Sequence, residues 1–468
     1  MQDLAEFTIK YLQKKGASYA EAKYQEIESN SFIIKNGSLD ISSFDIIKGI
    51  GVRFILNKKL GFLSTNILEK DALIKQLENS LKMALKTKIS EKVEFSEEKA
   101  NRANYEVKQK IKLSNVSTDE KISILMAAEK EMRSVDTKIE STYIHLSDNE
   151  TLNYYVNSDG SKIQSKIPTA SFIYVISVRE NGRTSQRYSE YGGGGGFEVV
   201  KNFKIPSLLK SEVEAMKNNL RYGKKPPQGV VDAVLGPQVS GIIAHESGGH
   251  PYEADRIFGR EAAQAGGSFV NKDMIGYKIG NEAVTIVDDP TVENGYGFYL
   301  YDDEGVKARR KYIIKNGAIT EFLHNRQTAK LMGLKSNGSA RSNAFDKEPI
   351  VRMSNTFFLP GGYTEEELIE DVKLGVYIKN FMEWNIDDKR INQKYVGSEC
   401  YLIENGKIKN PIIAPKIETT TFKLYPSIDA CGKNLEYHAG DCGKSDPLQG
   451  IPVILGGPSI RVRRVKVS

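Results

Sequence analysis

The sequence predicts an α+β protein, with helices and an antiparallel sheet in its first half and mostly antiparallel strands in its second half. Apolar residues recur at helical spacing in three long segments of the first half, at residues 3–15, 68–86 and 118–134. Short apolar runs flank Asn-Gly pairs, which favour tight hairpin turns, at Asn36, Asn316 and Asn405. Together these patterns indicate mixed local structure in which most strands pair with their sequence neighbours.

The first half contains further elements between these helices. Residues 199–220 are expected to be helical around Pro206, whereas the polar stretch 87–113 is expected to form a loop. The glycine run 192–196 lacks the features of a phosphate-binding loop and is interpreted as a flexible loop. Strands are expected at residues 22–27, 31–35, 38–46, 49–56, 60–65, 141–146, 151–157 and 169–180.

A Pro-Pro-Gln-Gly stretch at residues 226–229 is interpreted as the linker between two domains, residues 1–225 and 226–468. The second domain is predicted to be a β-rich domain that carries a metal-binding helix. Its expected strands are residues 231–235, 284–287, 308–314, 319–323, 350–359, 396–404, 407–413, 453–455 and 460–467. Helices are expected from residue 239, at 326–332 and at 364–375, the last beginning with a capping box.

Composition narrows the class of protein. The chain has 66 basic and 60 acidic residues, and this small excess is spread along the sequence, so no nucleic-acid surface is expected. Neither a signal peptide nor an apolar run long enough for a membrane span is visible. Three cysteines, all in the last 70 residues, are too few for a disulfide framework and favour a cytoplasmic protein.

The most informative stretch is His245-Glu246-Ser247-Gly248-Gly249-His250, in a chain that has five histidines. The familiar zinc-peptidase motif places two histidines four residues apart on one helix face, beside a glutamate that acts as general base. Here the interval is five residues, a rotation of roughly 140° on a regular helix. Either the pair does not bind metal, or the helix widens locally into an i→i+5 turn, with the glycines easing the distortion and leaving room for a ligand.

A catalytic zinc ion usually has three protein ligands and one open position. His245 and His250 would supply two of them. The third ligand stays open on chemistry alone, and the candidates are His324, His438, Cys431, Cys442, Glu253 and Asp255. Each cysteine could also be a small buried apolar residue. His145 is expected to be a strand residue without a catalytic role.

The chain resembles the TldD branch of the TldD/PmbA peptidase family along nearly its whole length. The similarity includes Gly49-Ile50-Gly51-Val52-Arg53 near the start, the histidine motif in the centre and Cys442-Gly443-Lys444 near the end. Further ordered blocks lie at residues 36–37, 61–65, 234–237, 287–290, 302–305, 329–333, 349–356, 401–406, 451–453 and 457–458.

This resemblance implies a zinc ion bound by His245, His250 and Cys442, with Glu246 as the catalytic residue. The ligand role is carried to Cys442 because its Cys-Gly-Lys block precedes Pro452-Val453, as in the family; Cys431 begins a similar block where the family has no ligand. The family further implies hydrolysis of unfolded or extended peptides, and pairing either with a PmbA-like paralogue or with a second copy.

Two alternatives to a zinc peptidase remain at this stage. The chain could be a non-catalytic partner or peptide-binding subunit in which the histidine pair is structural. It could also be a thiol-dependent enzyme that uses Cys431 or Cys442 with His438. The acidic segments 288–289 and 302–304 are expected to be solvated turns rather than substrate contacts.

Overall fold

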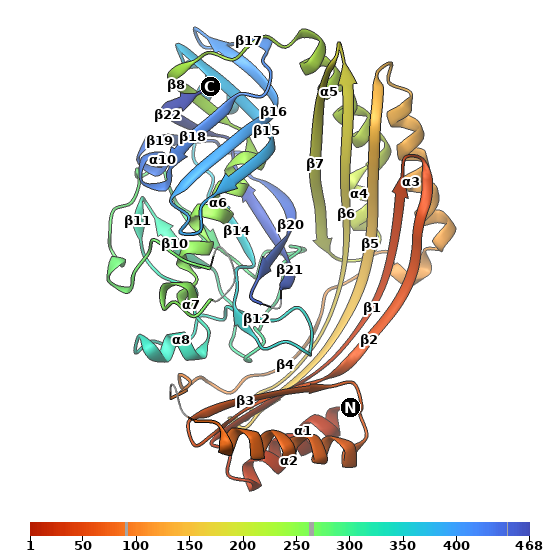
Figure 1. Ribbon diagram of the computed structural model, residues 1–468, viewed down its shortest axis with the longest axis vertical. Coiled ribbons are helices and arrows are strands. Elements are labelled where there is room, and N and C mark those ends of the chain that lie inside the picture. Colours follow the sequence, from red (N-terminus) through yellow and green to blue (C-terminus); the bar gives the residue numbers. More distant parts are fainter. Residues whose placement is uncertain (89–91, 262–265, 447) are drawn as a thin grey trace.

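The computed structural model describes residues 1–88, 92–261, 266–446 and 448–468 (Figure 1). A long curved sheet contains the strands of the first half, and the strands of the second half form three further sheets beside it. This architecture confirms the predicted α+β class. The division into two domains at residues 225 and 226 stays a prediction. None of the helices in the described ranges is long and apolar enough to cross a membrane.

The first sheet has the strand order β3-β2-β1-β5-β6-β4, and β7 also pairs with β6. Its strands are β1 (Tyr19–Lys35), β2 (Ser38–Leu56), β3 (Lys59–Thr65), β4 (Arg102–Glu106), β5 (Lys138–Asn157), β6 (Lys162–Glu180) and β7 (Arg183–Gly194). Several strands are about twice as long as the apolar runs that predicted them. The register of β1 with β5 runs unbroken from Glu21 to Lys35, because polar residues at the predicted break lie on a sheet with a solvated face.

Helices cover this sheet in two places. Near the N-terminal end, α1 (Gln2–Lys14) and α2 (Lys70–Lys86) pack on β1, β2 and β3 around Leu12, Phe54 and Leu77. Farther along the sheet, α3 (Thr118–Arg133), α4 (Glu198–Phe203) and α5 (Ile205–Tyr222) pack around Phe172 and Leu209. The helices α1, α2 and α3 follow the predicted segments closely. The single helix expected over residues 199–220 is divided into α4 and α5. The short 3-10 helix η1 spans Leu113–Asn115.

In the second half, one sheet has the order β15-β8-β22-β18-β16-β17, with β19 on β22, and another has the order β11-β10-β9-β14-β21-β20. The strands of the first are β8 (Gly229–Leu235), β15 (Leu374–Ile386), β16 (Asn392–Glu404), β17 (Lys407–Pro411), β18 (Lys416–Thr420), β19 (Ile428–Cys431) and β22 (Ile460–Val467). Those of the second are β9 (Ile286–Asp288), β10 (Lys311–Lys315), β11 (Ala318–Ile319), β14 (Asn355–Phe358), β20 (Glu436–Lys444) and β21 (Gln449–Gly457). A two-stranded sheet joins β12 (Ala340–Arg341) to β13 (Ile350–Val351).

The helix α6 (Pro237–Gly248) lies between these sheets and contacts β14, β15, β20 and β21. Every residue of α6 from Gln238 to Gly248 is buried, as expected of a helix without a polar face. The remaining helices are η2 (His250–Tyr252), α7 (Ala254–Ile257), η3 (Lys272–Met274), α8 (Arg326–Leu331), α9 (Glu365–Glu370) and α10 (Thr421–Ser427). The largest apolar core of the chain surrounds α6.

Three expectations about local structure were wrong. The polar stretch 87–113 is not a loop throughout, because Arg102–Glu106 forms the strand β4, which pairs with β6. The segment after Asn181-Gly182 is the strand β7, and Gly192, Gly193 and Gly194 are its last residues rather than part of a flexible loop. Its few apolar residues hid it, because side chains such as Arg187 and Glu190 are buried against neighbouring elements. The helix expected over residues 364–375 ends at Glu370, and the chain turns into β15.

The acidic segments 288–289 and 302–304 are not solvated turns. Asp288 is fully buried and lies 2.8 Å from the ammonium of Lys311. Glu304 is buried against Arg53 of β2, whose Nη2 lies 2.6 Å from its carboxylate, and the Arg53 Nε donates to Glu21 at 2.7 Å. Arg53 therefore connects the first sheet to the second half of the chain through buried charges.

We expect the Arg53→Met variant to lower the free energy of unfolding by about 3–5 kcal/mol, because Glu21 and Glu304 would lose their buried cation. Thermal and urea denaturation would measure the change. The matched control is Arg179→Met, which removes a 2.6 Å ion pair with Glu140 from a side chain that is 49% exposed. That change should cost about 1 kcal/mol or less. Equal effects of the two substitutions would contradict a special role for Arg53.

Candidate metal centre

The strand β8 and the helix α6 position the histidine motif. Gly236 separates them, and a Cβ atom there would lie 2.6 Å from the carbonyl oxygen of Lys379, so the turn needs glycine. Pro237 takes the first helical position, where its missing N–H costs nothing. Burial of α6 from Gln238 to Gly248 then holds His245 and Glu246 in the last turn of the helix.

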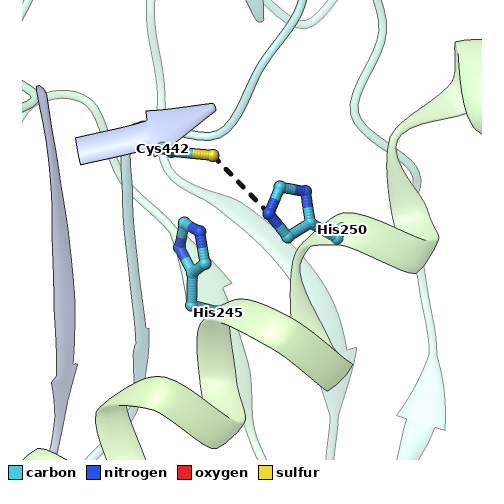
Figure 2. A group of neighbouring side chains, drawn as sticks. All are labelled: His245, His250 and Cys442. Carbon is cyan, nitrogen blue, oxygen red and sulfur yellow. Dashed lines mark hydrogen bonds between the residues drawn. The ribbon is translucent and has the colours of Figure 1, made fainter. Parts of the chain in front are cut away.

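The five-residue interval is resolved by the end of the helix. The α-helix ends at Gly248, the chain bends at Gly249, and His250 begins the 3-10 helix η2. This bend returns His250 to the same side as His245, with ring centroids 4.7 Å apart and planes at 83° (Figure 2). The local widening into an i→i+5 turn that the spacing suggested is therefore not the solution that the chain adopts.

The two glycines of the motif serve close packing. A Cβ atom at Gly248 would lie 2.6 Å from Ile286 Cδ1, and one at Gly249 would lie 1.9 Å from Met353 Sδ. The expectation that these glycines leave room for a ligand was wrong, because apolar side chains fill the space. Their small size instead allows the bend between the two histidines to occur inside a packed core.

The third member of the group is Cys442 on β20. Its Sγ lies 3.5 Å from His250 Nε2, and the ligand atoms of His245, His250 and Cys442 all lie within 4.8 Å of one another (Figure 2). Two ligands of one tetrahedral zinc ion lie about 3.5 Å apart. His245 Nδ1 is buried and has no hydrogen-bond partner among the described residues. Two imidazoles and a thiol that converge in this way fit a zinc ion.

A buried carboxylate orients His250. Glu253 Oε2 lies 3.0 Å from His250 Nδ1, which leaves Nε2 directed toward Cys442. Arg256 Nε donates to the same oxygen at 2.6 Å, and Lys444 Nζ lies 3.3 Å away. Burial alone would raise the pKa of Glu253, but Lys444 and Arg256 hold it well below its usual value. Ligating histidines commonly have such a carboxylate on their second nitrogen.

The Cys442 thiol is poised to ionise. Burial alone would raise its pKa, but His250 and Arg352 outweigh burial and lower the pKa to about 7. Arg352 also donates a hydrogen bond to the carbonyl oxygen of Cys442 and another, at 2.9 Å, to that of Gln449. Because the thiolate is the form that binds metal, these neighbours favour ligation at neutral pH.

Sequence analysis missed Arg390, which forms a buried ion pair with Glu246. Arg390 lies in the turn between β15 and β16 and has a positive φ of 65°. Burial would raise the pKa of Glu246, but Arg390 leads the charges that lower it. The stretch Asp387-Asp388-Lys389-Arg390 is typical of a solvated turn, so no local signal marks this arginine as buried.

The other candidate ligands lie outside the group of His245, His250 and Cys442 and have other partners. Cys431 Sγ lies 3.3 Å from the carbonyl oxygen of Ala283, and His324 Nδ1 lies 3.2 Å from Thr328 Oγ1. The carboxylate of Asp255 accepts from Lys444 at 2.7 Å. His438 lines a cavity beside the metal centre without joining the three-residue group. His145 lies in β5, where its Nε2 is 2.9 Å from Ser31 Oγ.

Two buried histidines at a helix end and a buried cysteine on a neighbouring strand, with a carboxylate beside them, are a donor set of the kind that zinc hydrolases use. The chain belongs to the PmbA/TldD metallopeptidase family, which confirms the resemblance drawn from its motifs. The matches are to PmbA/TldA metallopeptidase domain 1 at residues 20–86, to the central domain at residues 111–219 and to the C-terminal domain at residues 228–468.

Individual relatives agree with this assignment. A metalloprotease of Methanocaldococcus jannaschii is 33% identical over 95% of both chains. A zinc metalloprotease TldD homolog of Saccharolobus solfataricus is 26% identical over 98% of both. Among solved structures, TldE from Thermococcus kodakarensis superposes with a TM-score of 0.79 at 17% identity, covering 99% of this chain and 100% of that one. The last similarity concerns the fold alone.

The geometry predicts that Cys442→Ser loses zinc while Cys431→Ser retains it. Both cysteines are buried, but only Cys442 lies with the histidine pair. Metal content per chain, measured by mass spectrometry after zinc is supplied, is expected to be about one for the wild type and Cys431→Ser, matching a single three-donor site. Zinc retained by Cys442→Ser, or lost equally from both variants, would exclude Cys442 as a specific ligand.

Proposed function

We propose that the protein is a zinc-dependent peptidase that hydrolyses unfolded or extended peptides. The observation that carries this proposal is the group of His245, His250 and Cys442, with Glu246 next to His245 on α6. The metallopeptidase family and the zinc named for the Saccharolobus solfataricus relative support it.

Each residue has a role in this proposal. His245, His250 and Cys442 would hold the ion, which when bound lowers the pKa of a coordinated water and polarises the scissile carbonyl. Glu246 would accept the proton of the attacking water and deliver it to the leaving amine. The ion pair with Arg390 keeps Glu246 ionised, the form that a general base requires, and restrains its rotamer.

Two strands offer places for an extended peptide. β20, which carries Cys442, is the last strand of its sheet, and β7 is a terminal strand of the long sheet. The two strands contact each other where their sheets meet. A peptide that pairs its main chain with such an edge needs little side-chain recognition, which suits varied unfolded substrates.

We expect Glu246→Gln to lower kcat/KM for a fluorescent casein substrate by about 10²–10⁴-fold, the usual contribution of a general base, while zinc content stays unchanged. Glu282→Gln is the control, since the Glu282 side chain is 86% exposed and belongs neither to the three-residue group nor to the cavity beside it. Full activity of Glu246→Gln would refute the role of Glu246. A zinc-loaded wild type without hydrolysis would favour the alternative of a non-catalytic, PmbA-like binding subunit.

We further propose that a second chain, either another copy or a PmbA-like paralogue, covers part of β2. Residues 38–48 are all exposed, and on the side away from β1 they pair with no strand in the described parts of the chain. This segment, at the outer side of the sheet in Figure 1, bears five exposed large apolar residues, namely Leu39, Ile41, Phe44, Ile46 and Ile47. An unpaired apolar edge of this kind is a typical pairing surface.

The double variant Phe44→Asp/Ile46→Asp should dissociate a dimer, because two charges would be placed on the apolar edge. Light scattering coupled to size-exclusion chromatography would report the mass. Met83→Asp on α2 is the control, since that side chain is 69% exposed away from this edge. A wild type that is monomeric alone would overturn self-association and leave the paralogue as the expected partner.

The cytoplasm is the proposed location. Cys400, Cys431 and Cys442 are all buried and free, and they form no disulfide bond. Free thiols of this kind suit a reducing compartment, where a thiolate can serve as a metal ligand without being oxidised.

A further inference from the structure

A cavity lies directly beside the metal centre, between β7 and β20. Its volume is ≈ 90 Å³, enough for several water molecules or the end of one side chain. His245 and Glu246 form part of its wall. A substrate bound for hydrolysis would therefore have one of its groups within reach of this cavity.

One wall of the cavity is acidic. Glu190 of β7 is only 3% exposed, and its Oε2 accepts a hydrogen bond from Tyr188 at 3.1 Å. Its other oxygen is buried and has no hydrogen-bond partner within the described ranges. Asp441 of β20 lies nearby, and burial together with the Asp441 charge raises the pKa of Glu190 to about 7. A buried carboxylate oxygen without a partner costs free energy that a ligand could recover.

Among the described residues, no lysine or arginine balances these carboxylates. Neither Glu190 nor Asp441 forms an ion pair with a lysine or arginine of the described segments. His438 also lines the cavity, but both ring nitrogens lack hydrogen-bond partners and burial lowers its pKa to about 4, so it is neutral. The three-residue group at the metal centre does not include Glu190 or Asp441.

Another part of the wall is aromatic. Phe381 and Trp384 of β15 pack edge to face with ring centroids 5.1 Å apart, and Trp384 is 36% exposed. Aromatic faces attract organic cations, and their apolar surface also suits the methylene stem of a long basic side chain. A cavity lined by both carboxylates and aromatic rings is thus suited to a cation that carries apolar surface.

We propose that this cavity is a specificity pocket for a positively charged group of the peptide substrate, with Glu190 as the residue that selects it. The group is either the ammonium or guanidinium of a Lys or Arg side chain or the α-ammonium of the peptide N-terminus. The proposal rests on the proposed peptidase function, and it names the chemical class that the site prefers.

The chain provides its own reporter, because Trp384 is its single tryptophan and lines the cavity. The test uses the zinc-loaded Glu246→Gln variant, which binds without cleaving. Acetylated alanine hexapeptide amides with one Lys, Arg, Gln or Leu at each position are titrated while Trp384 fluorescence is recorded. The unacetylated alanine hexapeptide amide is the probe for the α-ammonium.

We expect the best Lys or Arg peptide, or the unacetylated peptide, to bind about tenfold or more tighter than its neutral counterpart, as desolvated charge pairs do. Selectivity confined to the Lys and Arg peptides would identify a side-chain pocket. Selectivity confined to the free N-terminus would identify an α-ammonium pocket. Equal affinity for charged and neutral peptides at every position would overturn the proposal.

Variants distinguish binding of the cation in this cavity from attraction to the negative charge of the protein surface in general. Glu190→Gln should remove the preference for the cation, measured as the ratio of the affinities for charged and neutral peptides, and Glu190→Asp should restore part of it. Glu436→Gln, which removes a carboxylate of β20 outside the cavity, should keep the preference. A preference that survives Glu190→Gln would overturn the role of Glu190. Because binding is measured without cleavage, a wild type that fails to hydrolyse peptides would refute the peptidase and not the pocket.

Discussion

The close packing of α6 against the sheet of β14, β20 and β21 is the constraint on which the metal centre depends. Gly241 permits it, since a Cβ atom there would lie 3.0 Å from the backbone of Leu455 and Gly456. His245 lies in the last turn of this helix and His250 follows in η2, and Cys442 lies 192 residues after His250 on the neighbouring sheet. Because a packed core resists displacement, the distance between helix and sheet sets the distance between the ligands.

Buried charges around the metal centre orient the ligand side chains. Lys444 and Arg256 fix Glu253, which in turn fixes the ring of His250, while Arg352 holds the strand that bears Cys442. Removing both partners of such pairs often costs little stability, whereas leaving one partner alone costs much. These buried charges serve mainly to fix the geometry of the metal centre, because each charged group has one arrangement that satisfies its neighbours.

The fold class and the three candidate metal ligands could be predicted from the sequence. Helical and hairpin periodicities gave the α+β class, and the two histidines with Cys442 came from a motif and a family resemblance. The remainder depends on contacts between distant segments. Arg390 and Glu190 sit in stretches that look solvated, yet other parts of the chain bury them. The strand β7 was missed for the same reason, since its inward side chains are polar and have partners such as Ser398, which accepts a hydrogen bond from Arg187 and lies 211 residues later in the sequence.

The placement of Glu190 and Asp441 on different sheets has a mechanical consequence. β7 belongs to the long sheet and β20 to the sheet that carries Cys442, so the two carboxylates face each other across the seam between the halves of the chain. A cation bound between them would be attracted to both carboxylates, and it would thereby link the long sheet to the sheet that carries Cys442. In the proposed pocket, the substrate itself would be that link.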